Sequence, residues 1–112
     1  RVEGGVTYPL GFRASGIHCG LRKNKTKKDL ALILSEKKAA AACVYTTNLV
    51  KGAPLIVTKE HIKDGYAQAV ICNSGNANTC NANGVEIAEK MSLVIANELK
   101  INKEDIWQLM KH

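Results

Sequence analysis

Aromatic residues are scarce in this chain of 112 residues. They make up 4% of it, as one Trp, one Phe and three Tyr. Because aromatic side chains bury the largest areas in a protein core, a core built from this sequence must rest on Ala, Val, Ile and Leu. Such a core has few large contacts, and the surface of a partner could complete it.

The chain also lacks the marks of a membrane, secreted or zinc-binding protein. Its apolar runs stay far below the roughly 18 residues that span a bilayer, and we expect no signal peptide. The four cysteines form no C-x-x-C pair and no metal-like spacing with a histidine. We therefore expect no metal, no membrane contact and a reducing, cytoplasmic location.

Nucleophile chemistry based on cysteine is not favoured, although one arrangement stays open. Three of the four cysteines lie in or beside apolar runs, where a thiol behaves as a small hydrophobic group. Cys72 or Cys80 could still act with His61 as a Cys–His pair.

His18 is interpreted as a structural histidine, and Arg13 could pair with a substrate carboxylate or with a surface acid.

Acidic residues are outnumbered, since 16 Lys and Arg face 10 Asp and Glu, which gives a net charge of +6. Such an excess often indicates a nucleic-acid partner. Five of the basic residues, however, fall within residues 22–28, and this run has no aromatic residue for base stacking. We interpret the run as a solvated hairpin loop and expect no nucleic-acid partner. Its field could attract the phosphates of an anionic cofactor.

The periodicity of apolar residues predicts an α/β or α+β fold in which strands dominate the first two-thirds. A helix is expected over residues 84–100, capped by Asn83 with Glu86 in a capping box, and it should lie on one face of a sheet. A short helical turn is expected at 59–62. Strands are predicted at residues 16–21, 29–35, 39–46, 55–57 and 67–72, and another is expected to begin at Ile106.

The polar run from Asn73 to Cys80 is the most informative segment, because it follows an apolar strand and precedes the long helix. Small polar residues in such a turn present backbone N–H groups and short side chains to a ligand. The same residue types also build ordinary turns and caps, so a purely structural connection is the alternative. The residues assigned to substrate binding are Asn73, Ser74, Gly75, Asn76 and Asn78.

Five motifs occur in the order found in one enzyme family. Together they make the chain, from about Gly4 to about Ile106, resemble ornithine acetyltransferase, also called glutamate N-acetyltransferase. The motifs are Gly4-Gly5-Val6-Thr7, the segment from Gly11 to Gly20, Lys28-Asp29-Leu30-Ala31-Leu32-Ile33, Tyr45-Thr46-Thr47-Asn48 and the turn from Asn73 to Cys80.

The resemblance implies a role in arginine biosynthesis and a layered sandwich of β-sheet covered by helices. Enzymes of this family are made as a precursor that cuts itself before a threonine, which becomes the N-terminal nucleophile of a second chain. This threonine moves an acetyl group from N-acetylornithine, or from acetyl-CoA in some members, to glutamate. Oxyanion donors stabilise each tetrahedral intermediate.

The chain departs from the family pattern near its end, at residues 108–112. A Ser-Thr-Gly segment of the oxyanion hole and the cleavage-site threonine should follow in the family, and neither is present. None of the six threonines of the chain lies in the nucleophile motif, so no catalytic residue is assigned. We expect residues 1–112 to be a single domain or the N-terminal fragment of a larger self-cleaving acyltransferase.

Such a fragment would be inactive alone and would require the remaining segments or the second chain of the precursor as its partner. No bound cofactor is expected, although acetyl-CoA is a possible substrate of the whole enzyme. A function of another class is a small non-catalytic binding protein that uses the turn of residues 73–78 or the basic loop of residues 22–28.

Overall fold

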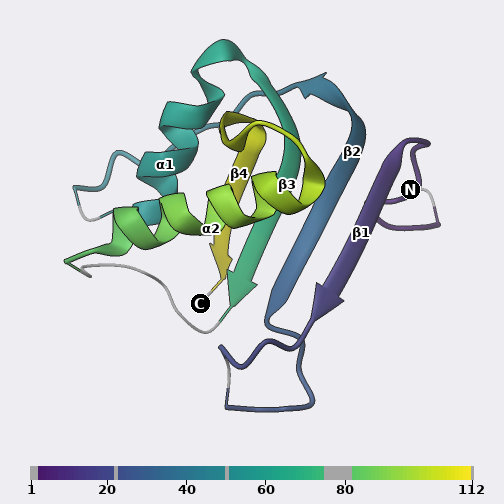
Figure 1. The fold of residues 1–112 in the computed structure, drawn as a ribbon, viewed down its shortest axis with the longest axis horizontal. Helices are drawn as coiled ribbons and strands as arrows, with labels where there is room; N and C mark the ends of the chain where they lie inside the picture. Colours follow the sequence, from purple (N-terminus) through teal and green to yellow (C-terminus); the bar gives the residue numbers. More distant parts are fainter. Residues whose placement is uncertain (1–2, 22, 50, 75–81, 112) are drawn as a thin grey trace.

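A computed structural model describes residues 3–21, 23–49, 51–74 and 82–111 of the chain (Figure 1). Its elements follow in the order β1 (Phe12–Ile17), β2 (Leu30–Ala40), α1 (Ala53–His61), the 3-10 helix η1 (Ile62–Asp64), β3 (Tyr66–Ser74), α2 (Gly84–Leu99), the 3-10 helix η2 (Lys103–Asp105) and β4 (Ile106–Lys111). The mixed arrangement confirms the predicted α/β class.

The four strands form one sheet in the order β1-β2-β3-β4. The β1–β2 and β2–β3 pairs are antiparallel, whereas β3 and β4 are parallel. Helix α2 supplies the long crossover that parallel neighbours need. The basic run of residues 22–28 lies in the connection between β1 and β2, and its described residues 23–28 are all exposed, as expected for a solvated hairpin loop.

The core lies between the sheet and the two helices, which pack on the same face (Figure 1). Strand β3 alternates buried and half-buried residues, because successive side chains of a strand point to opposite faces. Its buried members Ala69 and Ile71 meet Ala96 of α2 and Ile106 of β4. Three partly buried leucines of β2 pack against this cluster: Leu30, Leu32 and Leu34.

Helix α1 covers the outer edge of β4. The Oγ1 of Thr58 donates to the carbonyl oxygen of Gln108 at 3.1 Å and accepts from the backbone N–H of Gln108 at 3.0 Å. One turn later, the Nδ1 of His61 lies 3.0 Å from the carbonyl oxygen of Ile106. Two side chains of one helix thus satisfy backbone groups that an edge strand would otherwise leave unpaired.

A buried glutamine joins this helix and strand to α2. The Nε2 of Gln108 donates to the Oγ of Ser92 at 2.7 Å and to the carbonyl oxygen of Ala88. Both acceptors lie on the buried face of α2. Because a buried amide is costly without partners, these bonds fix the position of α2 over β4.

Two of the predicted strands are wrong. Residues 55–57 belong to helix α1, where Pro54 stands in the first turn, a position that proline favours. The buried residues Val57, Thr58 and His61 then share one helical face against β4, and this tertiary packing decides the conformation. The strand predicted at residues 39–46 does not form as a separate element either: residues 39 and 40 are the end of β2, and residues 41–48 contain no strand.

The first strand and the helix cap also differ from expectation. Strand β1 covers Phe12–Ile17 and ends before the predicted range of 16–21 does. Asn83 precedes α2 but makes no side-chain hydrogen bond to it. Glu86 pairs instead with Lys90, at 2.5 Å, and this hydrogen bond holds the pKa of Glu86 below its usual range.

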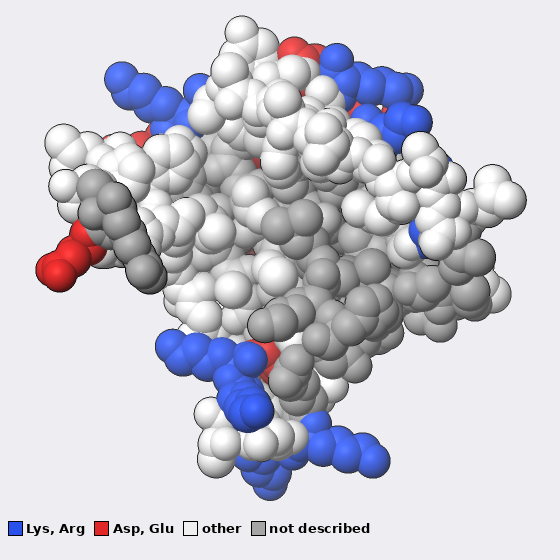
Figure 2. All heavy atoms as spheres, turned by 180° about the vertical axis from the view of Figure 1, so that it is seen from behind, with Lys and Arg blue, Asp and Glu red and all other residues white. Residues whose placement is uncertain are grey.

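The second face of the sheet carries no helix in the described structure, so β2 is buried from one side only. Every second side chain of a strand points to this face. A shallow groove of about 190 Å³ lies there, lined by Phe12, Ile33, Val70 and Trp107. Seen from behind, the middle of the molecule shows few charged side chains and the Lys and Arg residues gather near the rim (Figure 2).

Candidate functional site

The predicted substrate-binding turn begins at the carboxyl end of β3. Asn73 and Ser74 are the last two residues of that strand, opposite Met110 and Lys111 of β4. Asn73 is only 8% exposed and shares the helix-covered face, whereas Ser74 is half-buried and points to the other face. Gly75, Asn76 and Asn78 lie outside the described residues.

A buried acid connects this strand end to the β1–β2 hairpin. Asp29, which is 2% exposed, accepts the backbone N–H of Cys19 on Oδ1 at 2.7 Å. Its own backbone N–H donates to the carbonyl oxygen of Ile17 at 2.9 Å, and its carbonyl oxygen accepts the N–H of Ser74 at 2.8 Å. Asp29 therefore positions the start of the polar turn relative to the hairpin.

His18 supports the same junction. Its Nδ1 lies 3.1 Å from Oδ2 of Asp29 and 3.1 Å from the carbonyl oxygen of Lys27. Both neighbours are hydrogen-bond acceptors, so this nitrogen carries a proton that it donates. These contacts show His18 in the structural role that the sequence favoured.

Cys19 is exposed but is not activated as a nucleophile. Desolvation raises the pKa of its thiol, and the nearby Asp29 carboxylate raises it further. A raised pKa lowers the thiolate fraction at neutral pH, and the thiolate is the reactive form. The arrangement of His18, Cys19 and Asp29 is therefore suited to holding the loop rather than to covalent chemistry.

A groove of about 430 Å³ lies beside Ser74 on the sheet face that has no helix. Its wall combines Ser74 and Cys72 of β3 with Lys27 and Lys28 of the hairpin. The Lys28 side chain lies over Gly16, where a Cβ atom would come within 3.2 Å of the Lys28 Cδ. The lining holds two lysines against one acid, Asp29, so it carries an excess of positive charge that suits an anion such as a carboxylate.

Cys72 lines this groove, but its suggested partner His61 does not. Cys72 lies on the opposite face of the sheet from His61, which is buried between α1 and β4. The proposed Cys72–His61 pair is therefore wrong, and Cys80 lies outside the described residues. Arg13 lines a separate shallow groove with Leu99.

The described residues hold neither a metal-binding cluster nor a membrane-spanning helix. Among these residues, no group of three or more His, Cys, Asp or Glu side chains could hold a metal ion. No helix there is long and apolar enough to cross a membrane.

Sequence reasoning missed Asp29 as a member of the site. The available signal was an acidic residue placed directly between the basic run and the apolar segment from Leu30. A buried acid directly before a half-buried strand must find hydrogen-bond donors, because an ionised carboxylate is costly to bury without them.

Comparison with known proteins identifies one family. The model described as the ArgJ family matches residues 13–109. The chain is similar to the arginine biosynthesis bifunctional protein ArgJ of Caldanaerobacter subterraneus, with 46% identity over 94% of the chain and 26% of that protein. The ArgJ protein of Symbiobacterium thermophilum is 47% identical over 92% of the chain and 26% of its own length. The chain thus spans about a quarter of these relatives.

Solved structures give the same result for the fold. The crystal structure of the arginine biosynthesis bifunctional protein ArgJ of Bacillus halodurans superimposes with a TM-score of 0.89 at 41% identity, covering 96% of the chain and 56% of that structure. Ornithine acetyltransferase of Mycobacterium tuberculosis, solved in complex with ornithine, gives a TM-score of 0.88 at 32% identity over 96% of the chain and 59% of that structure.

Proposed function

This chain belongs to the ArgJ family, and from that premise we propose that it forms the N-terminal part of an acetyltransferase of arginine biosynthesis. The observation that carries the proposal is the match to the Bacillus halodurans ArgJ structure, with a TM-score of 0.89 over 96% of the chain. In this proposal the complete enzyme moves an acetyl group from N-acetylornithine, or from acetyl-CoA, to glutamate. Its location is cytoplasmic.

The chain contributes no nucleophile in this proposal. An N-terminal threonine of a second chain attacks the acetyl donor and forms an acyl-enzyme, which divides one acyl transfer into two easier steps. The remaining segments of a family-length protein supply this threonine and the oxyanion donors. The coverage of about a quarter of the curated relatives supports a division of labour of this kind.

The open face of the sheet is the surface on which those remaining segments would pack. Phe12, a large apolar residue, is 37% exposed there, and apolar side chains of β2, β3 and β4 continue the same face. Contiguous apolar surface of this kind marks an interaction site in a soluble protein. The chain also has few aromatic residues to fill its core. Segments that pack on this face would supply the apolar contacts that the core lacks.

Within the complete enzyme we place the turn of residues 73–78 at the edge of the substrate site. In layered α/β proteins, ligands bind beyond the carboxyl ends of strands, and β3 and β4 both end there. Lys27, Lys28 and Ser74 line the adjoining groove, whose ammonium and hydroxyl groups suit the carboxylates of N-acetylornithine and glutamate.

The isolated chain provides the first test. We expect no acetyl transfer from N-acetylornithine to glutamate, even at high protein concentration. Intact-mass measurement of the same sample must show that no other enzyme chain is present. A measurable rate from a sample that passes this control would overturn the assignment of the nucleophile to a second chain.

A non-catalytic binding protein remains the second candidate, favoured by the exposed lysines of residues 23–28. The two functions differ in what they need from the rest of a family-length protein. A binding protein would keep its function without the remaining segments, whereas an acetyltransferase part would gain activity only when they are added.

A further inference from the structure

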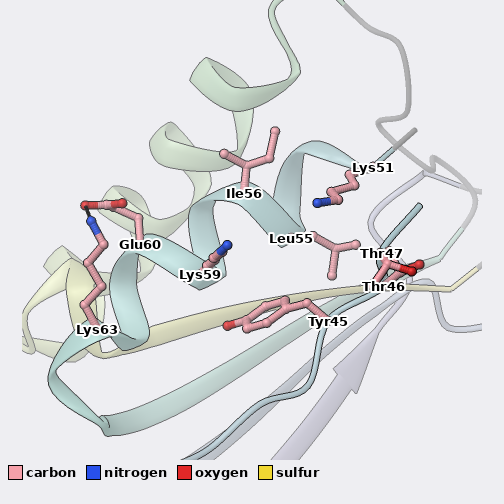
Figure 3. Close-up of a pocket in the computed structure, with 9 residues that line it drawn as sticks. All are labelled: Tyr45, Thr46, Thr47, Lys51, Leu55, Ile56, Lys59, Glu60 and Lys63. Atoms are coloured by element: carbon pink, nitrogen blue, oxygen red, sulfur yellow. Dashed lines mark hydrogen bonds and ion pairs between the residues drawn. The ribbon is translucent and has the colours of Figure 1, made fainter. Parts of the chain in front are cut away.

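A further groove lies on the opposite side of helix α1 from the core. It runs between α1 and the segment of residues 45–47 and has a volume of about 640 Å³ (Figure 3). This volume is within the range of small-molecule sites in proteins, about 300–1,000 Å³. None of its lining residues belongs to the groove beside Ser74.

Two lysines of this groove have no acidic partner in the described structure. Lys63 is neutralised by Glu60, with 2.6 Å between Nζ and Oε1. Lys51 and Lys59, by contrast, form no ion pair with any described carboxylate, and both line the groove between α1 and residues 45–47 (Figure 3). The groove therefore holds two uncompensated positive charges.

Hydroxyl groups and an apolar floor accompany these charges. The side chain of Leu55 lies between the two lysines, the ring of Tyr45 lies on the other wall, and Thr46 and Thr47 stand at one end (Figure 3). The Oγ1 of Thr46 accepts the N–H of Asn48 at 3.1 Å, so its own proton stays available to a ligand. Burial raises the pKa of Tyr45, and the neighbouring Cys43 adds to this shift, which keeps the phenol a neutral donor.

We propose that this groove binds an organic phosphate, with the phosphate held by Lys51 and Lys59 across Leu55 and the apolar part against Tyr45. A phosphate near neutral pH carries up to two negative charges and three acceptor oxygens, which matches two ammonium groups and a threonine hydroxyl. A single carboxylate would leave one of the two charges unpaired. The site is separate from the substrate site proposed above and does not depend on it.

The test uses this chain with adenosine monophosphate as the probe, followed by the backbone NMR signals of the ¹⁵N-labelled protein. We expect saturable shifts at residues 45–47 and 51–60. Adenosine, which lacks the phosphate, should bind at least about tenfold more weakly, because it loses the charge-assisted bonds. Glutamate serves as the carboxylate comparison and should also bind more weakly than adenosine monophosphate.

Substitutions locate the contact. Lys51→Gln and Lys59→Gln should each weaken binding about tenfold, the size expected for loss of a charge-assisted hydrogen bond. Lys23→Gln is the matched control, because it makes the same charge change at an exposed lysine outside the groove, and it should leave affinity within about twofold. Melting temperatures identify any variant that fails to fold.

Several results would overturn the proposal. If adenosine binds as tightly as adenosine monophosphate, the phosphate makes no contact that matters for affinity. If Lys23→Gln weakens binding as much as Lys51→Gln or Lys59→Gln does, the lysines act only through the overall charge of the protein. Shifts confined to residues 23–28 would assign the anion to the basic loop. An absence of saturable binding at millimolar adenosine monophosphate would refute the proposal.

Discussion

The hydroxyl of Thr58 should contribute more to stability than any other single atom of α1, because it both donates to and accepts from the backbone of Gln108. Thr58→Val removes these two hydrogen bonds and keeps the shape of the side chain. Thr58 is 1% exposed, so water cannot replace the lost partner. The change leaves a buried N–H and a buried carbonyl oxygen of β4 without the bonds that α1 provides.

The expected loss of stability follows from the free energy of leaving buried polar groups without hydrogen bonds. Each such group costs about 1–3 kcal/mol, and two adjacent groups on one residue are not independent, so we expect a total of about 2–4 kcal/mol for Thr58→Val. Thr58→Ser keeps the hydroxyl and removes one methyl group, which should cost about 1 kcal/mol. The stability of a small domain is about 5–15 kcal/mol, so the difference between the variants is readily measured.

Urea unfolding followed by circular dichroism is the assay. The slope of the free energy of unfolding against urea must stay constant among the variants, so that a shift of the midpoint reports stability. Thr26→Val is the control, because Thr26 is exposed and bonds only to Asn24 two residues away. If Thr58→Val costs no more than Thr58→Ser, the hydroxyl does not hold α1 on the edge of β4 and the reasoning is refuted.

Three further predictions concern the hairpin and the turn. Replacing the three lysines of residues 25–28 by Gln should change stability by at most about 0.5 kcal/mol in urea unfolding, because exposed charges contribute little; a larger loss would mean that the loop packs. Cys19 should react with iodoacetamide more slowly than free cysteine at pH 8, since its raised pKa lowers the thiolate fraction, and its rate should rise at a higher pH than that of the free amino acid. An equal rate would contradict the desolvation argument. In a complete enzyme, Asn76→Ala and Asn78→Ala should lower turnover at unchanged melting temperature; parallel loss of both quantities would make the turn a structural connection.

The elements that the sequence predicted correctly are those whose signals are local. The alternation along β2 and β3 and the helical spacing of Met91, Ile95 and Leu99 each arise from one element packing on one surface. Strand β3 could therefore be placed to within two residues, although it runs on through Asn73 and Ser74, which were predicted to begin the polar turn. The position of this part of the candidate site was predictable for the same reason.

The elements that sequence reasoning missed depend on contacts between distant residues. The run from Leu55 to Val57 is apolar and short, so periodicity does not separate a helix from a strand. The helix forms because Thr58 bonds to Gln108, fifty residues further along the chain. Asp29 was missed in the same way, since its partners Cys19 and Ser74 come from different elements and no spacing in the sequence connects them.

The most direct test of the proposed function is a hybrid enzyme. This chain replaces the segment of Caldanaerobacter subterraneus ArgJ to which it aligns, about a quarter of that protein. Acetyl transfer from N-acetylornithine to glutamate is then measured for the hybrid, for the chain alone and for the ArgJ remainder alone. We predict turnover in the hybrid and none in either part alone. A folded hybrid without turnover, or turnover by the chain alone, would contradict the account.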